Sequence, residues 1–272
     1  MSAGRGEANI RRARGSPQVR WGNAVGKSLS ERFAVGPGTK VRLGQWDPDD
    51  TAGYTGKEAA QEALARNIER LAELEYLLYA QNRRALLVVL QAMDGGGKDG
   101  TIRHVMTGLN PQSCRVTAFK APSAAELAHD FLWRVHPAAP AKGEIGILNR
   151  SHYEDVLAVR VRRLAPKSVW AGRYRAINEF ERTLAESGAV ILKFFLHISK
   201  REQAKRLRAR LEDPTKNWKL DPTDFEDRGR WDRYVLAYEA ALSRCSTPHA
   251  QDRAAGGRRR ERHLRPYGLP VR

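Results

Sequence analysis

The sequence of 272 residues has few cysteines and no long hydrophobic segment. Its two cysteines, Cys114 and Cys245, lie far apart and form no CxxC pair, so we expect neither a disulfide framework nor a zinc site. No stretch approaches the roughly 18 consecutive apolar residues of a membrane span, and the Arg-rich N-terminus lacks the apolar core of an export signal. These absences favour a cytoplasmic protein with no membrane partner.

Acidic residues are scarce beside basic ones. The chain has 31 Asp and Glu against 48 Lys and Arg, for a net charge of +17. Residues 1–20 carry +4 and residues 251–272 carry +5, which leaves +8 for the residues between them. The central excess favours a polyanionic ligand. No ladder of aromatic residues or known binding motif accompanies it, so specific nucleic-acid binding is the weaker interpretation.

The hydrophobic pattern alternates between strands and helices. Apolar runs predict four strands, at residues 85–93, 116–119, 144–149 and 189–198. Helical spacing or capping signals predict helices at residues 57–80, 99–109, 123–136, 151–164, 167–186, 199–213 and 224–245. This order predicts an α/β fold, a three-layer αβα sandwich whose mainly parallel sheet has crossover helices on both faces.

The pattern also divides the chain. Residues 1–55 show neither period and are predicted to be an irregular N-terminal arm. Residues 56–249 form one predicted domain, in which the basic helix broken at Pro214 suits a helical lid over about residues 200–222. Residues 250–272 are basic and show no apolar period, so we expect no strand or helix there.

The stretch QAMDGGGKDG, residues 91–100, follows the first predicted strand. Glycines 95, 96 and 97 would let backbone N–H groups approach phosphate oxygens, and Lys98 would add a full charge. The P-loop pattern G-x-x-x-x-G-K-[ST] is met only in part, because Ala92 and Asp99 hold its first and last positions. The plainer alternative is a tight strand-to-helix turn.

Acidic residues flank this loop, and one of them predicts a metal. A carboxylate at Asp94 would repel phosphates unless a cation lay between them. We therefore predict Asp94 as the first ligand of Mg²⁺, with Mn²⁺ as a substitute.

A second group of polar residues ends the third predicted strand, in ILNRSHYED at residues 147–155. Arg150 is placed to neutralise phosphate charge, and Glu154 and Asp155 are available for metal or substrate. The alternative for Arg150 is a surface ion pair with Glu154. The alternative for the basic lid is a solvated helix face.

Together these motifs resemble the polyphosphate kinase 2 family. The resemblance rests on QWDPDD (45–50), LVVLQAMDGGGKDGTIRHVMTGLNP (87–111), EIGILNRSHYEDVLAVRV (144–161) and NWKL (217–220). It implies a P-loop fold similar to thymidylate kinase and a kinase that moves phosphoryl groups from inorganic polyphosphate to nucleoside mono- and diphosphates with Mg²⁺. It also implies a homo-oligomer, a dimer or tetramer, if the C-terminus permits.

The resemblance implies roles for individual residues. Asp94, Lys98, Arg150 and Glu154 would be catalytic, and Asp94 and Asp155 would hold the metal. Asn149 stands where many family members have Asp. The phosphate- and nucleotide-binding residues would be Gly95, Gly96, Gly97, Asp99, Gly100, Thr101, Arg103, Asn149, Arg208 and Lys219.

Two alternatives to this activity stay open. An ATP-dependent nucleotide kinase could use the same fold, although no adenine-donor feature is visible. An inactive or impaired relative would follow if residues 250–272 replaced the C-terminal strand and helix that the family has.

Overall fold

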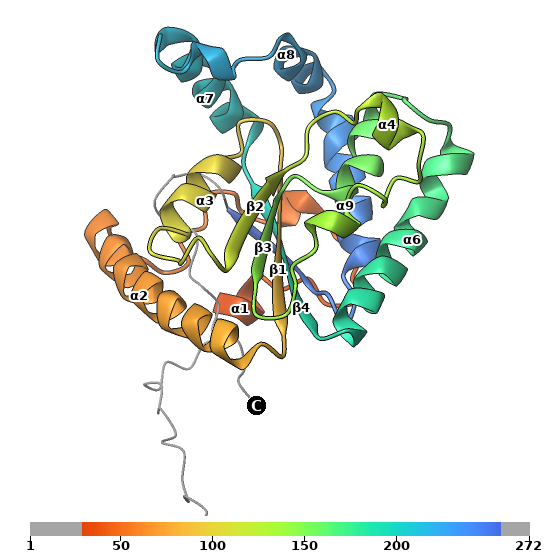
Figure 1. Cartoon of the computed structure of the whole chain (residues 1–272). Helices are drawn as coiled ribbons and strands as arrows, with labels where there is room; N and C mark the ends of the chain where they lie inside the picture. The colour runs from red at the N-terminus through yellow and green to blue at the C-terminus, as the bar shows by residue number, and fades with distance from the viewer. Residues whose placement is uncertain (1–28, 257–272) are drawn as a thin grey trace, which may run out of the picture.

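The computed structural model describes residues 29–256, which fold around a five-stranded sheet (Figure 1). The strands are β1 (Ala85–Ala92), β2 (Cys114–Ala118), β3 (Ile145–Asn149), β4 (Ala189–His197) and β5 (Asp252–Gly256), in the order β2-β3-β1-β4-β5. Every neighbouring pair is parallel. The prediction of a parallel α/β sheet is confirmed, and all four strands expected from the sequence are present.

Helices cover both faces of the sheet, so the three predicted layers are also present. One face packs against α2 (Lys57–Gln81) and α3 (Lys98–Val105), through Leu86, Val88 and Leu90 of β1. The other face packs against α6 (Lys167–Glu186) and α9 (Trp231–Cys245). Because β1 lies at the centre and is covered twice, all eight of its residues are buried, which explains its unbroken apolar sequence.

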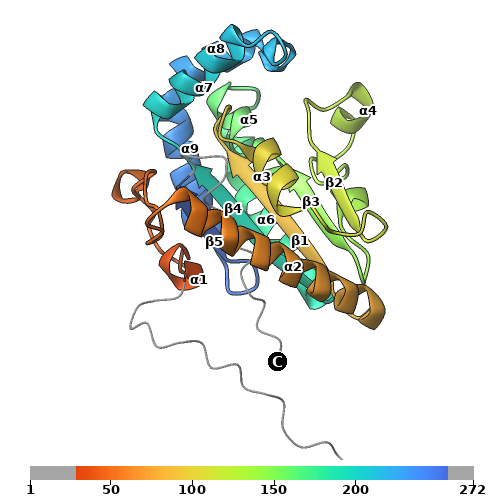
Figure 2. The same cartoon turned by 90° about the vertical axis from the view of Figure 1, so that its left-hand side faces the viewer.

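The predicted lid, about residues 200–222, contains α7 (Lys200–Glu212) and the 3-10 turn η4 (Asn217–Lys219), and α8 (Pro222–Gly229) continues the same projecting segment. Both views show it projecting past the end of the sheet where β1 gives way to α3 (Figures 1 and 2). Every helix within residues 29–256 falls short of the length and hydrophobicity that a membrane crossing needs.

The helix predicted over 99–109 ends at Val105, and three other predicted helices are shortened or interrupted. Instead of a helix over 123–136, the chain has only α4 (Ala124–Leu127), because the Asp130 side chain accepts the Leu132 amide and starts a turn before the 3-10 turn η2 (His136–Ala138). The capping box of Ser123 and Glu126 is confirmed. The expected helix 151–164 is split into η3 (His152–Asp155) and α5 (Ala158–Val161), and that of 224–245 into α8 and α9 at Gly229 and Arg230.

The N-terminal arm contributes to the core. Between residues 29 and 56 it contains α1 (Leu29–Arg32), an isolated β-bridge from Ala34 to Arg253 and the 3-10 turn η1 (Leu43–Gln45), and is otherwise irregular. Val35, Val41 and Leu43 are buried with the α6 and α9 side of the sheet. The amides of Val41 and Leu43 donate to Ser243 Oγ and Glu239 Oε1 of α9, both at 2.8 Å.

The expectation of no strand after residue 250 is wrong. β5 adds a fifth strand in register with β4, with Asp252 opposite Lys193 and Ala254 opposite Phe195. The sequence DRAAG carries little apolar signal because this strand is held by backbone pairing and by one buried charge contact. The remainder of the predicted tail, residues 257–272, and the first 28 residues of the arm lie outside the described part of the chain.

Candidate active site at the phosphate loop

The backbone of the loop from Asp94 to Lys98 requires glycine. Gly95 and Gly97 have φ values of +76° and +100°, which side chains other than glycine rarely adopt. A Cβ at Gly96 would lie 2.4 Å from Ala92 Cβ and 2.7 Å from the Met93 carbonyl oxygen. The turn therefore brings backbone amides to the start of α3 with no side chain in front of them, as a phosphate cradle needs.

Lys98 is the first residue of α3 and lies inside this loop. Its side chain is only 9% exposed, and Nζ donates to the Ala92 carbonyl at 3.1 Å. Burial lowers the pKa of Lys98, while the nearby Asp94 opposes that shift. The Lys98 ammonium group is therefore held at the end of β1, beside the loop amides that would bind phosphate.

Arg150 faces the loop from the end of β3. Its Nη2 lies 2.7 Å from Asp94 Oδ1. Its φ of +61° places a non-glycine residue in the left-handed region, a strained conformation that neighbouring contacts must maintain. Arg150 pairs with Asp94 across the sheet, whereas the sequence also allowed a local pair with Glu154.

Glu154 is the second carboxylate near this arginine. The hydrogen-bond partners of the Gln91 side-chain amide orient its oxygen toward Ser151 and its nitrogen toward Glu154. In that orientation the amide nitrogen donates to Glu154 Oε1 at 3.1 Å. Burial raises the pKa of Glu154, and the charges of Arg150 and Lys98 partly offset the rise. The sequence analysis predicted Asp94, Lys98, Arg150 and Glu154 as catalytic residues. In the structure the charges of all four interact in one cluster.

Asp99 occupies the position where the usual P-loop has a hydroxyl residue. Asn149 Nδ2 donates to Asp99 Oδ1 at 2.7 Å. The contact joins the start of α3 to the end of β3, so both of these predicted residues lie at the site.

The lid contacts the loop through Arg206, which belongs to the predicted basic helix, and through Gln203, which the sequence analysis did not select. Gln203 Nε2 donates to the Asp94 carbonyl at 2.9 Å, and Arg206 Nη1 donates to the Gly95 carbonyl at 3.1 Å. Asp224 of α8 is buried, and its pKa is raised by burial and then by Asp94. Gln203 and Arg206 are three positions apart on α7, a spacing that places them on one face of a helix and could have marked them.

Other predicted site residues make no side-chain contact with the loop, although the Thr101 amide donates to the Gly97 carbonyl at 2.9 Å. Asp155 Oδ1 receives Arg173 Nη1 at 2.7 Å. Arg103 and Arg208 are exposed on α3 and α7, and the Lys219 ammonium lies 5.0 Å from the centre of the Trp218 ring. Gly100 and Thr101 lie inside α3 and are partly exposed.

The carboxylates can be compared with the needs of a metal ion. Within residues 29–256, no group of three or more His, Cys, Asp or Glu side chains is arranged to hold one. Mg²⁺ commonly takes only one or two protein carboxylates and completes its shell with water and substrate phosphates. Asp94 and Glu154 fit that demand because both interact with Lys98 and Arg150 at the loop, whereas Asp155 pairs with Arg173.

A glycine turn after the central strand, a buried lysine at the start of the next helix and an arginine at the end of the neighbouring strand define a P-loop phosphotransferase fold. Comparison with known proteins narrows that class. The polyphosphate kinase 2 family profile matches residues 54–253. The chain belongs to this family.

Individual relatives agree with this assignment. The chain is 56% identical over 221 residues to an AMP/ADP-polyphosphate phosphotransferase of Meiothermus ruber, covering 81% of this chain and 83% of that protein. It is 49% identical over 233 residues to an ADP-polyphosphate phosphotransferase of Rhodopseudomonas palustris, covering 81% of each. The crystal structure of polyphosphate kinase 2 from Arthrobacter aurescens TC1 matches with a TM-score of 0.82 and 44% identity, over 86% of this chain and 83% of that one.

Proposed function

We propose that this protein transfers the terminal phosphoryl group of inorganic polyphosphate to nucleoside diphosphates and monophosphates, such as ADP, GDP and AMP, in a reversible reaction. The observation that carries the proposal is the meeting of the Asp94–Lys98 loop with Arg150, in a chain of the polyphosphate kinase 2 family. The name of the Meiothermus relative supports the dual acceptor range.

The chemistry asks the protein to align two phosphate groups and to neutralise their charge. The loop amides and Lys98 would bind the transferring phosphoryl group. Arg150 would exchange its contact with Asp94 for contacts with phosphate oxygens, which frees the Asp94 carboxylate. Asp94 and Glu154 would hold a Mg²⁺ ion, which would supply positive charge that offsets the charge of the phosphates.

The lid would close over the chain of phosphates. Arg206 already contacts the phosphate loop, and the exposed Arg208 and the half-buried Lys219 would reach a longer polyanion extending from it. The central excess of positive charge supports this role. The expected homo-oligomer and the cytoplasmic location stay predictions.

A direct assay tests the proposal. Purified protein is incubated with Mg²⁺, polyphosphate and ADP, and then with AMP, and new nucleoside phosphates are measured. We expect ATP from ADP. A folded protein that makes no product from any polyphosphate length would be an impaired relative, and one that requires ATP as donor would be an ATP-dependent kinase.

Variants of the loop test the assigned roles. Lys98→Ala and Asp94→Asn should each lower kcat by about 10²–10³-fold, because each removes charge stabilisation from the transition state. The melting temperature should change little. Lys142→Ala, at an exposed turn, is the matched control and should retain full activity. Full activity of Asp94→Asn would refute the metal assignment.

A further inference from the structure

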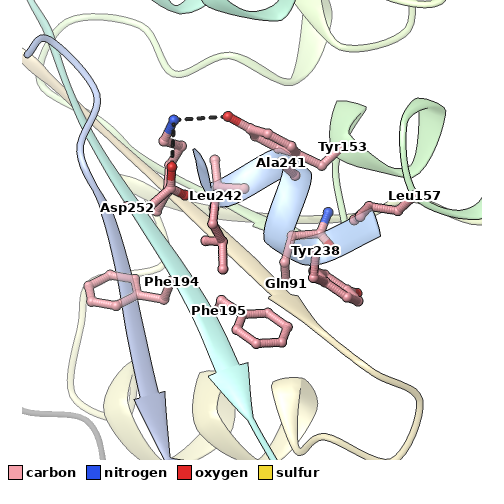
Figure 3. Close-up of a pocket in the computed structure, with 11 residues that line it drawn as sticks. Gln91, Tyr153, Leu157, Phe194, Phe195, Tyr238, Ala241, Leu242 and Asp252 are labelled. Atoms are coloured by element: carbon pink, nitrogen blue, oxygen red, sulfur yellow. Dashed lines mark hydrogen bonds and ion pairs between the residues drawn. The ribbon is translucent and has the colours of Figure 1, made fainter. Parts of the chain in front are cut away.

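A buried lysine lies beneath the acidic segment of the site. Lys193 of β4 is 1% exposed, and its ammonium group has four oxygen neighbours. Nζ lies 2.9 Å from Tyr153 Oη, 2.8 Å from Glu181 Oε2, 2.6 Å from the Cys245 carbonyl oxygen and 3.3 Å from Asp252 Oδ2. In Figure 3, dashed lines join Tyr153 and Asp252 to this one nitrogen.

Glu181 of α6 connects this lysine to η3. Its carboxylate is fully buried and accepts from Lys193, while its Oε1 accepts from Tyr153 Oη at 2.9 Å. The same oxygen lies 3.2 Å from His152 Nε2. Burial alone would raise the pKa of Glu181, but Lys193 and His152 bring the net shift below the ordinary value. The carboxylate is therefore charged, and two consecutive residues of η3 are fixed to it.

The short segment that contains this fixed pair begins and ends with residues that face the phosphate loop. Arg150 begins it in the left-handed conformation, and Glu154 ends it. Ser151 is also held, because its Oγ accepts the Tyr153 amide at 3.2 Å and lies 2.8 Å from the Gln91 amide. The segment is thus attached to the core at every position between the two site residues.

We propose that Tyr153, Glu181 and Lys193 form a positioning group that holds Arg150 and Glu154 against the phosphate loop. The inference rests on the proposed phosphotransfer function. A strained residue such as Arg150 keeps its conformation only where surrounding contacts fix it, and this group supplies those contacts from below the site.

The choice of charged residues supports a positioning role. Ion pairs removed from water contribute little net stability, and apolar residues of similar size would serve a purely structural core as well. Directional hydrogen bonds to Tyr153 fix the position of η3 in a way that apolar packing does not. The hydrogen bonds of these three side chains do not reach the phosphate loop. We therefore expect them to affect catalysis through the positions of Arg150 and Glu154.

The test is Tyr153→Phe, which keeps the ring and the Lys193–Glu181 pair but removes the hydroxyl that joins η3 to them. We expect kcat with ADP and polyphosphate to fall by about 10-fold, with both KM values within twofold of wild type, because misplaced catalytic groups slow the chemical step. Tyr174→Phe is the matched control, since it also removes a tyrosine hydroxyl that accepts from a cationic side chain, here Arg160 at 3.2 Å in place of Lys193.

Hydrogen–deuterium exchange supplies a readout that does not depend on activity. In Tyr153→Phe, amide exchange should rise over residues 150–157 and stay unchanged in α9, whereas Tyr174→Phe should leave residues 150–157 as in wild type. Unchanged kcat, or exchange that rises throughout the core, would overturn the inference. If wild-type protein makes no ATP, the proposed function fails, and the exchange pattern alone decides the positioning role.

Discussion

Gly96 is the phosphate-loop residue with the least room for a side chain, and the contact involves backbone as well as side-chain atoms. Gly96→Ala should therefore force the loop to shift. We expect the free energy of unfolding to fall by about 1–3 kcal/mol, as for other overpacked sites. Because the shifted amides no longer meet the phosphate, kcat should fall as well. Urea denaturation and the ATP assay measure the two effects.

Gly172→Ala is a control that should change the free energy of unfolding in the opposite direction. Gly172 lies inside α6, and a Cβ built there meets no atom within 4 Å. The substitution should stabilise the protein by up to about 1 kcal/mol, because glycine is a poor helix former. Activity should not change. Equal behaviour of the two variants would show that the phosphate loop tolerates a side chain.

At the residue scale, the sequence predicted the site residues that directly follow a strand of the sheet. Lys98 and Asp94 follow β1, and Arg150 and Glu154 follow β3, so the parallel sheet brings them together by register alone. Gln203 and Asp224 were missed because their approach depends on how the lid packs. No local sequence pattern predicts how the lid helices pack against the loop.

At the scale of elements, β5 differs most from expectation, and its one buried acid makes it sensitive to pH. Burial raises the pKa of Asp252 to about 7, although Lys193 opposes the shift. The unfolded chain would release this proton near the ordinary value of 3.8. Between these values the folded state binds more protons, so the contribution of Asp252 to stability declines as pH rises through this window.

Asp252→Asn should remove this dependence. The free energy of unfolding of the variant, relative to wild type, should increase from pH 4.5 to pH 7.5 in urea titrations. Asp232→Asn, at an exposed position of α9, controls for the general loss of an acidic group. A difference that stays constant across the window, or declines, would contradict the assignment of the raised pKa to Asp252.

The elements that the sequence predicted well are those with the strongest burial. β1 and β4 have continuous apolar sequences because helices cover both of their faces. α4 and β5 have no such signal. α4 ends early because a single aspartate redirects the backbone, and β5 exists because β4 offers an edge with which it can pair.

At the scale of the whole molecule, the net charge of +17 predicts a salt effect that separates the two substrates. Screening lengths fall from about 10 Å at 0.1 M salt to about 3 Å at 1 M. Raising KCl should therefore increase KM for polyphosphate more than KM for ADP, since the longer polyanion meets more of the basic surface. Sucrose at equal osmolality is the control. Equal increases for both substrates would argue against a distributed basic surface.

The N-terminal arm and β5 are also far apart in the chain yet joined in the fold. Val35 donates its amide to the Asp252 carbonyl at 2.9 Å, and its carbonyl accepts from Ser246 Oγ across 211 positions of sequence. Figure 2 shows α1 and β5 on the same side of the molecule. During synthesis on a ribosome, residues 33–43 are made long before residues 239–254, which supply the hydrogen-bond partners of Val35, Val41 and Leu43. The arm is therefore made first and docked last, and the nascent chain must keep Phe33, Val35 and Leu43 from other hydrophobic surfaces until that moment.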